Sequence, residues 1–376
     1  MNNNHKMVKR FGIGLCLLVA STITYAETAT TNYQVSTVVN KLKFPWSLAF
    51  LPNNDMLVSE RGGSLRMIRD GKLLEQKITG LPEIYVRGPA GLFDVVLDPN
   101  FSSNQKLYIS YSGGSADNNY VEVISATLQD MALKQTKVIF TGSPRNTPHH
   151  HGARMAFLPD DTLLITAGDG FNMRDQAQSL DSMLGKVLRI NTDGSIPADN
   201  PFIGEKGIRP EIYTYGHRNP QAILISKSNK IWLHEHGPKG GDELNLLKPG
   251  LNYGWPAITH GIDYSGAIIS PFTEAECMEQ PIKYWIPSIA PAGMTEYQGD
   301  IFPQWQGNLF IAALAGQSVR RLVLDGNKVI EEEVMLADRN QRIRDIRTGP
   351  DGYIYILTDS PQGQLLKLMP KSTVKH

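Results

Sequence analysis

A strand–turn–strand pattern that recurs six times is the feature that most constrains how this chain folds. In its first copy, apolar residues 45–52 are followed by the turn Asn53-Asn54-Asp55 and a second apolar run at 56–60. Further copies begin near residues 91, 153, 220, 293 and 343, each followed by a Gly-containing turn and another strand. Four strands per ~40–50 residues is the period of a β-propeller blade. We therefore predict an all-β fold, a six-bladed β-propeller of four-stranded antiparallel blades, with a pair of β-sandwiches as the alternative.

The N-terminus has the pattern of a secretory signal peptide. Basic residues precede a short apolar run at 11–20, and Thr24-Tyr25-Ala26 is a suitable cleavage site. The apolar run is too short to cross a bilayer. We expect residues 1–26 to be removed on export to the periplasm and residues 27–376 to form one catalytic propeller domain. Cleavage leaves Cys277 as the one cysteine of the mature chain, so no internal disulfide is expected.

Charge and motif content exclude several functions. The formal net charge is zero, whereas a nucleic-acid-binding protein needs a basic face. The sequence contains no P-loop and no Gly-x-Ser-x-Gly motif. The stretch Gly168-Asp169-Gly170 lacks the third glycine of a dinucleotide-binding fingerprint.

A histidine cluster precedes the third copy of the repeat. His149, His150 and His151 lie just before Arg154, and the second apolar run of this copy ends at Asp169. Histidine exchanges protons near neutral pH and ligates metals, so this cluster is a candidate for chemistry. A solvated polar loop is the alternative for the residues taken alone.

A second candidate site follows the fourth copy. His234 and His236 share one face of a strand-like run, and Gly237-Pro238 follows them. A turn with bare backbone carbonyls beside acidic residues suits calcium, whereas a transition metal would use the imidazoles. A glycine-rich hairpin with a solvated tip is the alternative without a ligand.

Arginines occur at corresponding points of several repeats. Arg154, Arg218, Arg342 and Arg344 all lie near the start of a copy, where a propeller strand lines the central channel. Guanidinium groups bind carboxylates in a bidentate manner. Such a ring of arginines predicts a small ligand that is rich in carboxylates.

The chain also resembles a known family between Phe44 and about Leu368. The resemblance rests on five motifs, namely Leu184–Pro197, Tyr215-Gly216-His217-Arg218-Asn219-Pro220-Gln221, Glu235-His236-Gly237-Pro238, Asn252-Tyr253-Gly254-Trp255-Pro256 and Arg342-Ile343-Arg344-Asp345. In this order they are similar to the PQQ-dependent aldose sugar dehydrogenase and soluble glucose dehydrogenase family. The resemblance implies a six-bladed propeller that binds PQQ, a tricarboxylate quinone, and Ca²⁺.

The resemblance also implies roles for individual residues. His150 matches the general base and Asp169 an acidic residue near it, and we place Arg154 with them in the predicted catalytic group. The predicted cofactor-binding residues are Arg218, Asn219, Arg342, Arg344 and Trp285, and the main-chain carbonyls of Gly237 and Pro238 are the predicted calcium ligands.

The implied reaction is oxidation of an aldose at C1 to the lactone, with hydride transfer to PQQ and proton transfer to His150. Electrons then pass to an external acceptor such as a quinone or cytochrome. We expect a monomer or homodimer, with no nucleic-acid partner and no stable membrane insertion. A calcium-dependent propeller lactonase and a non-enzymatic binding propeller are the alternatives.

Two positions depart from the glucose dehydrogenases. Pro89 and Ala315 stand where those enzymes carry a glutamine near the base and a lysine at PQQ. Lys283 is a candidate to supply the missing positive charge.

Overall fold

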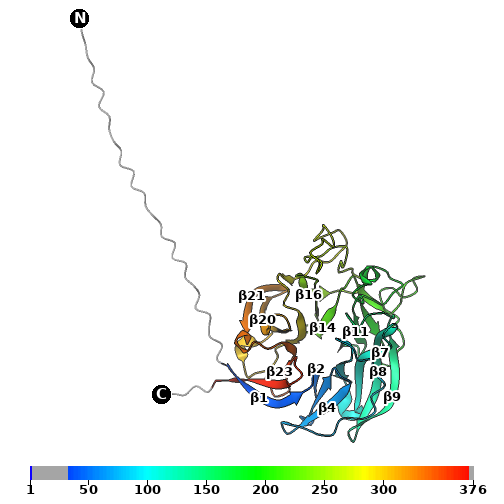
Figure 1. Ribbon diagram of the computed structural model, residues 1–376, viewed down its shortest axis with the longest axis vertical. Coiled ribbons are helices and arrows are strands. Elements are labelled where there is room, and N and C mark those ends of the chain that lie inside the picture. The colour runs from blue at the N-terminus through cyan, green and yellow to red at the C-terminus, as the bar shows by residue number, and fades with distance from the viewer. Residues whose placement is uncertain (2–32, 372–376) are drawn as a thin grey trace. The chain divides into compact units, whose positions relative to one another are not determined.

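The computed structural model describes Met1 and residues 33–371, and it confirms the predicted fold class. Within these residues the chain forms six four-stranded antiparallel sheets arranged around a ring (Figure 1). Apart from Met1, the predicted signal peptide lies outside the described residues. No helix in the described part of the chain is long and apolar enough to cross a membrane.

Each sheet is one blade, and its strands follow one another from the channel outward. Blade 1 contains β2 (Pro45–Phe50), β3 (Met56–Glu60), β4 (Ser64–Arg69) and β5 (Lys72–Leu73). Blade 2 contains β6 (Leu92–Leu97), β7 (Lys106–Gly114), β8 (Asn119–Gln129) and β9 (Ala132–Thr141). Blade 3 contains β10 (Gly152–Phe157), β11 (Leu163–Ala167), β12 (Lys186–Ile190) and β13 (Ile212–Tyr215).

The second half of the ring repeats this arrangement. Blade 4 contains β14 (Pro220–Ile225), β15 (Ile231–Glu235), β16 (Asp242–Leu247) and β17 (Lys283–Trp285). Blade 5 contains β18 (Pro291–Glu296), β19 (Leu309–Ala313), β20 (Ser318–Asp325) and β21 (Lys328–Met335). The helical elements are α1 (Phe101–Asn104) and the short 3₁₀ turns η1 (Arg174–Ala177), η2 (Pro303–Trp305) and η3 (Ala337–Arg339).

Blade 6 joins the two ends of the described chain. It contains β22 (Ile343–Thr348), β23 (Ile354–Thr358) and β24 (Gly363–Pro370), and its outer strand is β1 (Tyr33–Leu42). β1 pairs with β24 from Tyr33↔Pro370 to Leu42↔Gly363, so that the blue strand lies against the red ones in Figure 1. This pairing closes the ring by backbone hydrogen bonds, and the free cysteine Cys277 takes no part in it.

The apolar core lies between neighbouring blades. Six clusters of buried side chains form, and each draws mainly on two adjacent sheets. In blades 1 and 5, for example, the second strands β3 and β19 are buried along their whole length. Because both faces of such a strand are covered, its sequence is a continuous apolar run without alternation. This explains why the repeat is visible in the sequence.

All six innermost strands carry one extra residue near their first position. In β10, for example, the pair Gly152↔Ala167 is followed by Met155↔Ile165, so that two residues of β10 face one of β11. The same shift occurs in β2, β6, β14, β18 and β22. Such a β-bulge re-aims side chains at the end of a strand. In this ring the bulges fall at the central channel.

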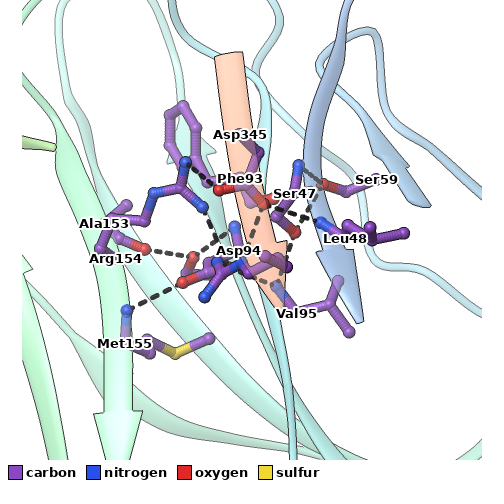
Figure 2. A network of polar contacts seen from close by, with 12 residues as sticks. Ser47, Leu48, Ser59, Phe93, Asp94, Val95, Ala153, Arg154, Met155 and Asp345 are labelled. Carbon is purple, nitrogen blue, oxygen red and sulfur yellow. Dashed lines mark hydrogen bonds and ion pairs between the residues drawn. The ribbon is translucent and has the colours of Figure 1, made fainter. Parts of the chain in front are cut away.

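Two buried carboxylates, Asp94 and Asp345, bind the buried Arg154 and the partly exposed Arg347 between the inner strands. Figure 2 shows this network around Asp94, Arg154 and Asp345. Arg154 is 2% exposed and lies 3.5 Å from Asp94 and 3.2 Å from Asp345. Arg347 contacts the same carboxylates at 3.6 and 3.0 Å. Asp345 also accepts the backbone N–H of Leu48 at 3.0 Å, and Asp94 that of Met155 at 3.0 Å. Blades 1, 2, 3 and 6 are thereby joined at the channel.

We expect Arg154→Met to lower the free energy of unfolding by about 3–5 kcal/mol, because it leaves two buried carboxylates to share Arg347. The measurement is chemical denaturation followed by tryptophan fluorescence.

Arg174→Met is the control, since Arg174 and its partner Asp263 are 44% and 40% exposed and such a pair contributes about 0–1 kcal/mol. Unchanged stability with complete loss of turnover in Arg154→Met would instead support the catalytic role predicted from the sequence.

Candidate active site

A cavity of about 400 Å³ lies at one end of the ring, where the inner strands begin and the second strands end. In antiparallel blades these ends coincide, so residues far apart in sequence meet there. The lining residues that precede inner strands are Gly88, Pro89, His149, His150, His151, Asn219 and Arg342. Those that follow second strands are Arg61, His236 and Leu314, and those at the bulges are Trp46, Phe93, Gln221 and Arg344.

A larger hollow of about 600 Å³ lies at the opposite end, where β18 and β22 finish. Its lining contains Glu296, Asp300 and Asp351 but no histidine and no arginine. The first cavity is therefore the candidate active site, because it contains the histidines and arginines that the predicted reaction requires.

His150 and Asp169 form a hydrogen-bonded pair at the cavity. His150 Nδ1 lies 2.7 Å from Asp169 Oδ1, and the side chains are 11% and 0% exposed. Trp255 Nε1 donates to the other carboxylate oxygen at 2.8 Å. With Asp169 ionised, Nδ1 carries the proton and Nε2 keeps the lone pair of the neutral ring. The hydrogen bond to Asp169 therefore fixes the orientation of the His150 ring and leaves Nε2 free to accept a proton.

The backbone at His150 is held in an unusual conformation. Its φ is +55°, a left-handed value that is uncommon outside glycine. The buried guanidinium of Arg145 donates to the His150 carbonyl, which fixes this turn. On the other side, a Cβ at Gly168 would lie 2.2 Å from the same oxygen, so only glycine fits there. Such local strain is typical of functional sites.

The environment sets the charge of both partners. Burial lowers the pKa of His150 and outweighs the opposing effect of Asp169, and the charge of Arg218 lowers this pKa further. Burial alone would raise the pKa of Asp169, but the hydrogen bond and charge of His150 hold this pKa below its usual value. At neutral pH the pair therefore consists of a neutral imidazole and a carboxylate, which is the state a general base requires.

The flanking histidines have other surroundings. His149 is exposed, with its ring 5.3 Å from that of Phe171. His151 is 4% exposed, bonds Asn119 Oδ1 at 3.1 Å, and has a pKa well below its usual value because it is buried. The described residues contain no group of three or more His, Cys, Asp or Glu side chains that would hold a metal ion.

The opposite wall of the cavity carries excess positive charge. Arg61, Arg342 and Arg344 share one carboxylate, Asp359, at 4.0, 3.2 and 3.3 Å. Arg344 is buried, and its Nε has no hydrogen-bond partner among the described residues. Burial, together with the charges of neighbouring arginines, lowers the pKa of Arg344. A ligand with several carboxylates would relieve this repulsion and fill the open hydrogen-bonding positions.

Arg218 lies at the predicted calcium turn and, with Pro238, lines a neighbouring hollow of about 380 Å³ rather than this cavity. Its Nη1 donates to the carbonyls of Gly237 and His236 at 2.6 and 3.1 Å. Asp242 holds the turn by accepting the Gly237 N–H at 2.9 Å, and its other oxygen accepts the N–H of Ile289 at 2.7 Å. The Gly237 carbonyl is thus aimed at a positive charge and retains a second lone pair for a cation.

The comparisons with known proteins agree with this geometry. Residues 42–367 match the model of the glucose/sorbosone dehydrogenase family. The chain is 44% identical over 365 residues to the aldose sugar dehydrogenase YliI of Escherichia coli K12, covering 95% of this chain and 97% of that protein.

Solved structures give the same result. The apo-form soluble aldose sugar dehydrogenase of E. coli aligns with a TM-score of 0.87 at 43% identity, over 90% of this chain and 99% of that one. The PQQ-bound aldose sugar dehydrogenase of Streptomyces coelicolor aligns with a TM-score of 0.72 at 26% identity, over 90% and 99%. The chain belongs to the glucose/sorbosone dehydrogenase family. It is accordingly an oxidoreductase of the sugar dehydrogenase type.

Three residues predicted for the site of this dehydrogenase do not line the cavity. Trp285 is on β17, the outer strand of blade 4, where it packs in the core and its Nε1 donates to Glu332 at 2.9 Å. Lys283 on the same strand pairs with Glu332 at 2.8 Å, so it supplies no charge to the cavity. Arg154 is not among the residues that line the cavity, because Asp94 and Asp345 hold it in the network below. The aromatic side chains at the cavity are Trp46 and Phe93.

Other residues of the dehydrogenase site escaped the sequence analysis. Arg61 directly follows β3, just as His236 directly follows β15, and both line the cavity. This shared position in the repeat could have identified Arg61 from the sequence. Asp359 directly follows β23, so the repeat marks it in the same way. Trp255 lies outside the strands, and its partner Asp169 comes from another loop, so the repeat does not mark it. Of the two departures, Pro89 lines the cavity, whereas Ala315 is exposed beside Leu314.

We expect Asp169→Asn to reduce turnover by roughly 10²–10⁴-fold, as loss of the orienting carboxylate does in comparable pairs. Because Asp169 raises the pKa of His150, its removal also shifts the acid limb of the kcat/KM profile to lower pH. The measurement is the pH dependence of aldose oxidation with an artificial acceptor.

Trp255→Phe is the matched control, since it removes one donor to Asp169 and keeps the carboxylate. An acid limb that stays in place in Asp169→Asn would show that His150 is not the titrating base.

Proposed function

We propose that this protein is a PQQ- and Ca²⁺-dependent dehydrogenase that oxidises aldose sugars at C1 to the lactone. The observation that carries the proposal is one cavity with a neutral, carboxylate-oriented histidine on one wall and clustered arginines on the other. The PQQ-bound structure of the Streptomyces relative supports this choice of cofactor.

The residues present fit both cofactors. Arg342 and Arg344, which share a single carboxylate, would bind the carboxylates of PQQ together with Arg218 and Asn219. Arg61 adds a further cation on this wall. The carbonyls of Gly237 and Pro238 would hold Ca²⁺, which prefers oxygen ligands. When bound, PQQ supplies the two-electron oxidant that accepts the C1 hydride, and Ca²⁺ supplies a Lewis acid.

The protein's own residues then handle the proton. His150 Nε2 accepts the proton of the anomeric hydroxyl as the C1–H bond gives up its hydride, so that C1–O1 becomes the carbonyl of the lactone. Asp169 stabilises the resulting imidazolium through the 2.7 Å hydrogen bond to Nδ1. Trp255 and Arg145 hold the carboxylate and the histidine backbone in place.

The lactonase alternative is less well supported. A propeller hydrolase of that type needs acidic and amide ligands for calcium at the channel centre. Here the central carboxylates, Asp94 and Asp345, are already paired with Arg154 and Arg347. A cation at this position would have to displace two guanidinium groups.

Export, electron transfer and assembly complete the proposal. Residues 1–26 direct the chain to the periplasm, where an external quinone or cytochrome reoxidises the cofactor. The enzyme acts as a monomer or homodimer.

The test is reconstitution of the apoprotein with PQQ and Ca²⁺, followed by glucose-dependent reduction of an artificial dye. We expect activity and a PQQ-induced rise in Tm, because a ligand that binds the folded state stabilises it. The idea would be abandoned if no aldose is oxidised and PQQ leaves Tm unchanged.

Two variants separate chemistry from binding. We expect His150→Ala to keep the PQQ-induced shift in Tm and to lose turnover by roughly 10²–10⁴-fold, the usual contribution of a general base. Arg344→Leu should instead weaken PQQ binding, since it removes a buried guanidinium that faces the cavity. His149→Ala is the control for His150, because His149 is exposed and, among the described residues, no carboxylate pairs with it as Asp169 pairs with His150. Equal loss of binding and turnover in His150→Ala would make His150 a cofactor ligand.

A further inference from the structure

A buried glutamate ends the second strand of blade 4, directly before the predicted calcium turn. Glu235 is 3% exposed and is the last residue of β15. Its Oε1 lies 2.8 Å from His217 Nδ1, and its Oε2 accepts the backbone N–H of Arg218. One carboxylate thus binds both a side chain and the backbone of the loop that leads into β14. The proposed reaction assigns no role to Glu235 or His217.

The ring of His217 is held on its other edge and on one face. Its Nε2 lies 2.9 Å from Thr214 Oγ1. The ring of Tyr253 stacks on it, with centroids 4.9 Å apart and an angle of 19° between the planes. Because His217 is also fully buried, these contacts fix its ring, and the ring in turn fixes the carboxylate of Glu235.

The backbone that this carboxylate fixes belongs to the residues predicted to bind PQQ. The carbonyl of Arg218 accepts the N–H of Asp169 at 2.9 Å, and its side chain donates to the carbonyl of Gly237 at 2.6 Å. The next carbonyl, of Asn219, accepts the N–H of His236 at 3.1 Å. The loop before β14 therefore contacts both the calcium turn and the carboxylate partner of the base.

Blade 1 has the same carboxylate without the histidine. Glu60, also 3% exposed, ends β3, and its Oε1 accepts the N–H of Lys43 at 2.7 Å. Lys43 lies two residues before Pro45, just as Arg218 lies two residues before Pro220.

The other four blades form the same strand pair without a glutamate. The residues that pair with the first residue of each inner strand are Glu60, Tyr111, Ala167, Glu235, Ala313 and Thr358. A glutamate at this position is therefore not required to build a blade. In blade 4 it is combined with His217 and followed by the turn Gly237-Pro238.

We propose that Glu235, oriented by His217, is a positioning residue that sets the affinity of the Gly237-Pro238 turn for Ca²⁺. This inference rests on the proposed function and adds residues that do not line the cavity. A main-chain carbonyl binds a cation only where its oxygen points toward the ion. Glu235 controls this direction, because it lies two residues before Gly237 and holds Arg218, which bonds the Gly237 carbonyl.

The test is a calcium titration of the PQQ-induced rise in Tm, at a fixed concentration of PQQ. Glu235→Gln keeps the shape of the side chain but leaves one acceptor oxygen for two donors. We expect it to raise the calcium concentration at the half-maximal shift by about tenfold, as loss of groups that orient metal ligands commonly does. Excess calcium should restore the full shift. A merely structural role would lower Tm at every calcium concentration and leave this midpoint in place.

Thr214→Val separates positioning from charge. It removes the hydroxyl that holds His217 Nε2 and leaves every charged group in place. We expect its calcium midpoint to rise by about fivefold, the effect of one lost hydrogen bond. An unchanged midpoint in Thr214→Val would mean that Glu235 acts through its charge alone and would overturn the positioning role.

Glu60→Gln is the matched control, because it removes an equally buried carboxylate from the same strand position in a blade without the calcium turn. Its calcium midpoint should remain at the wild-type value, and a rise equal to that of Glu235→Gln would contradict the proposal. If the wild-type protein responds to PQQ and calcium while Glu235→Gln responds at the same calcium concentration, the proposed function stands and the positioning role fails. If the wild-type protein shows no response, both fail.

Discussion

The site depends on the one-residue bulge at the start of each inner strand. In a regular strand, successive side chains point to opposite faces of the sheet and pack between blades. The extra residue breaks this alternation where the strand enters the channel. It presents Trp46, Phe93, Gln221 and Arg344 to the cavity and places Arg154 in the buried network. The same β-bulge occurs in all six inner strands, so each blade has one such position that can carry a different side chain.

The charges divide into two groups that behave differently. In the channel, two guanidinium groups pair with two carboxylates, so the charges of the network cancel. One layer away, three arginines share Asp359 and remain available to an anion. Arg154 and Arg344 both lie in bulges, but Arg344 lines the cavity, whereas Arg154 pairs with Asp94 and Asp345. The burial of Arg344 beside like charges is unfavourable in the protein alone, and such a cost is commonly retained where function requires it.

This division explains what the sequence allowed us to predict. The six-bladed fold was predictable because strands buried on both faces appear as apolar runs at a regular period. That His150 lies beside Asp169 was implied by the resemblance to the dehydrogenase family, and the structure places the two side chains in hydrogen-bond contact. The contacts of Arg154 and Trp285 could not be predicted, because each side chain binds a partner from another blade, Asp94 and Glu332 respectively. Trp285 also lies in an outer strand, and no local pattern distinguishes an outer-strand tryptophan from one at the channel.

Trp255 links His150 to a neighbouring cleft of about 380 Å³, which Phe171, Trp255 and Tyr264 line. Its indole N–H bonds Asp169, which orients His150, while its ring forms part of the cleft wall. Phe171 connects the two in the same way, since its backbone N–H donates to Asp169 at 2.7 Å and its ring packs against His150. Trp255 and Phe171 thus hold Asp169 and also line the cleft beside it. Since small errors in the position of a catalytic group cost rate steeply, the proposed base depends on the packing at this cleft as well as on its own hydrogen bond.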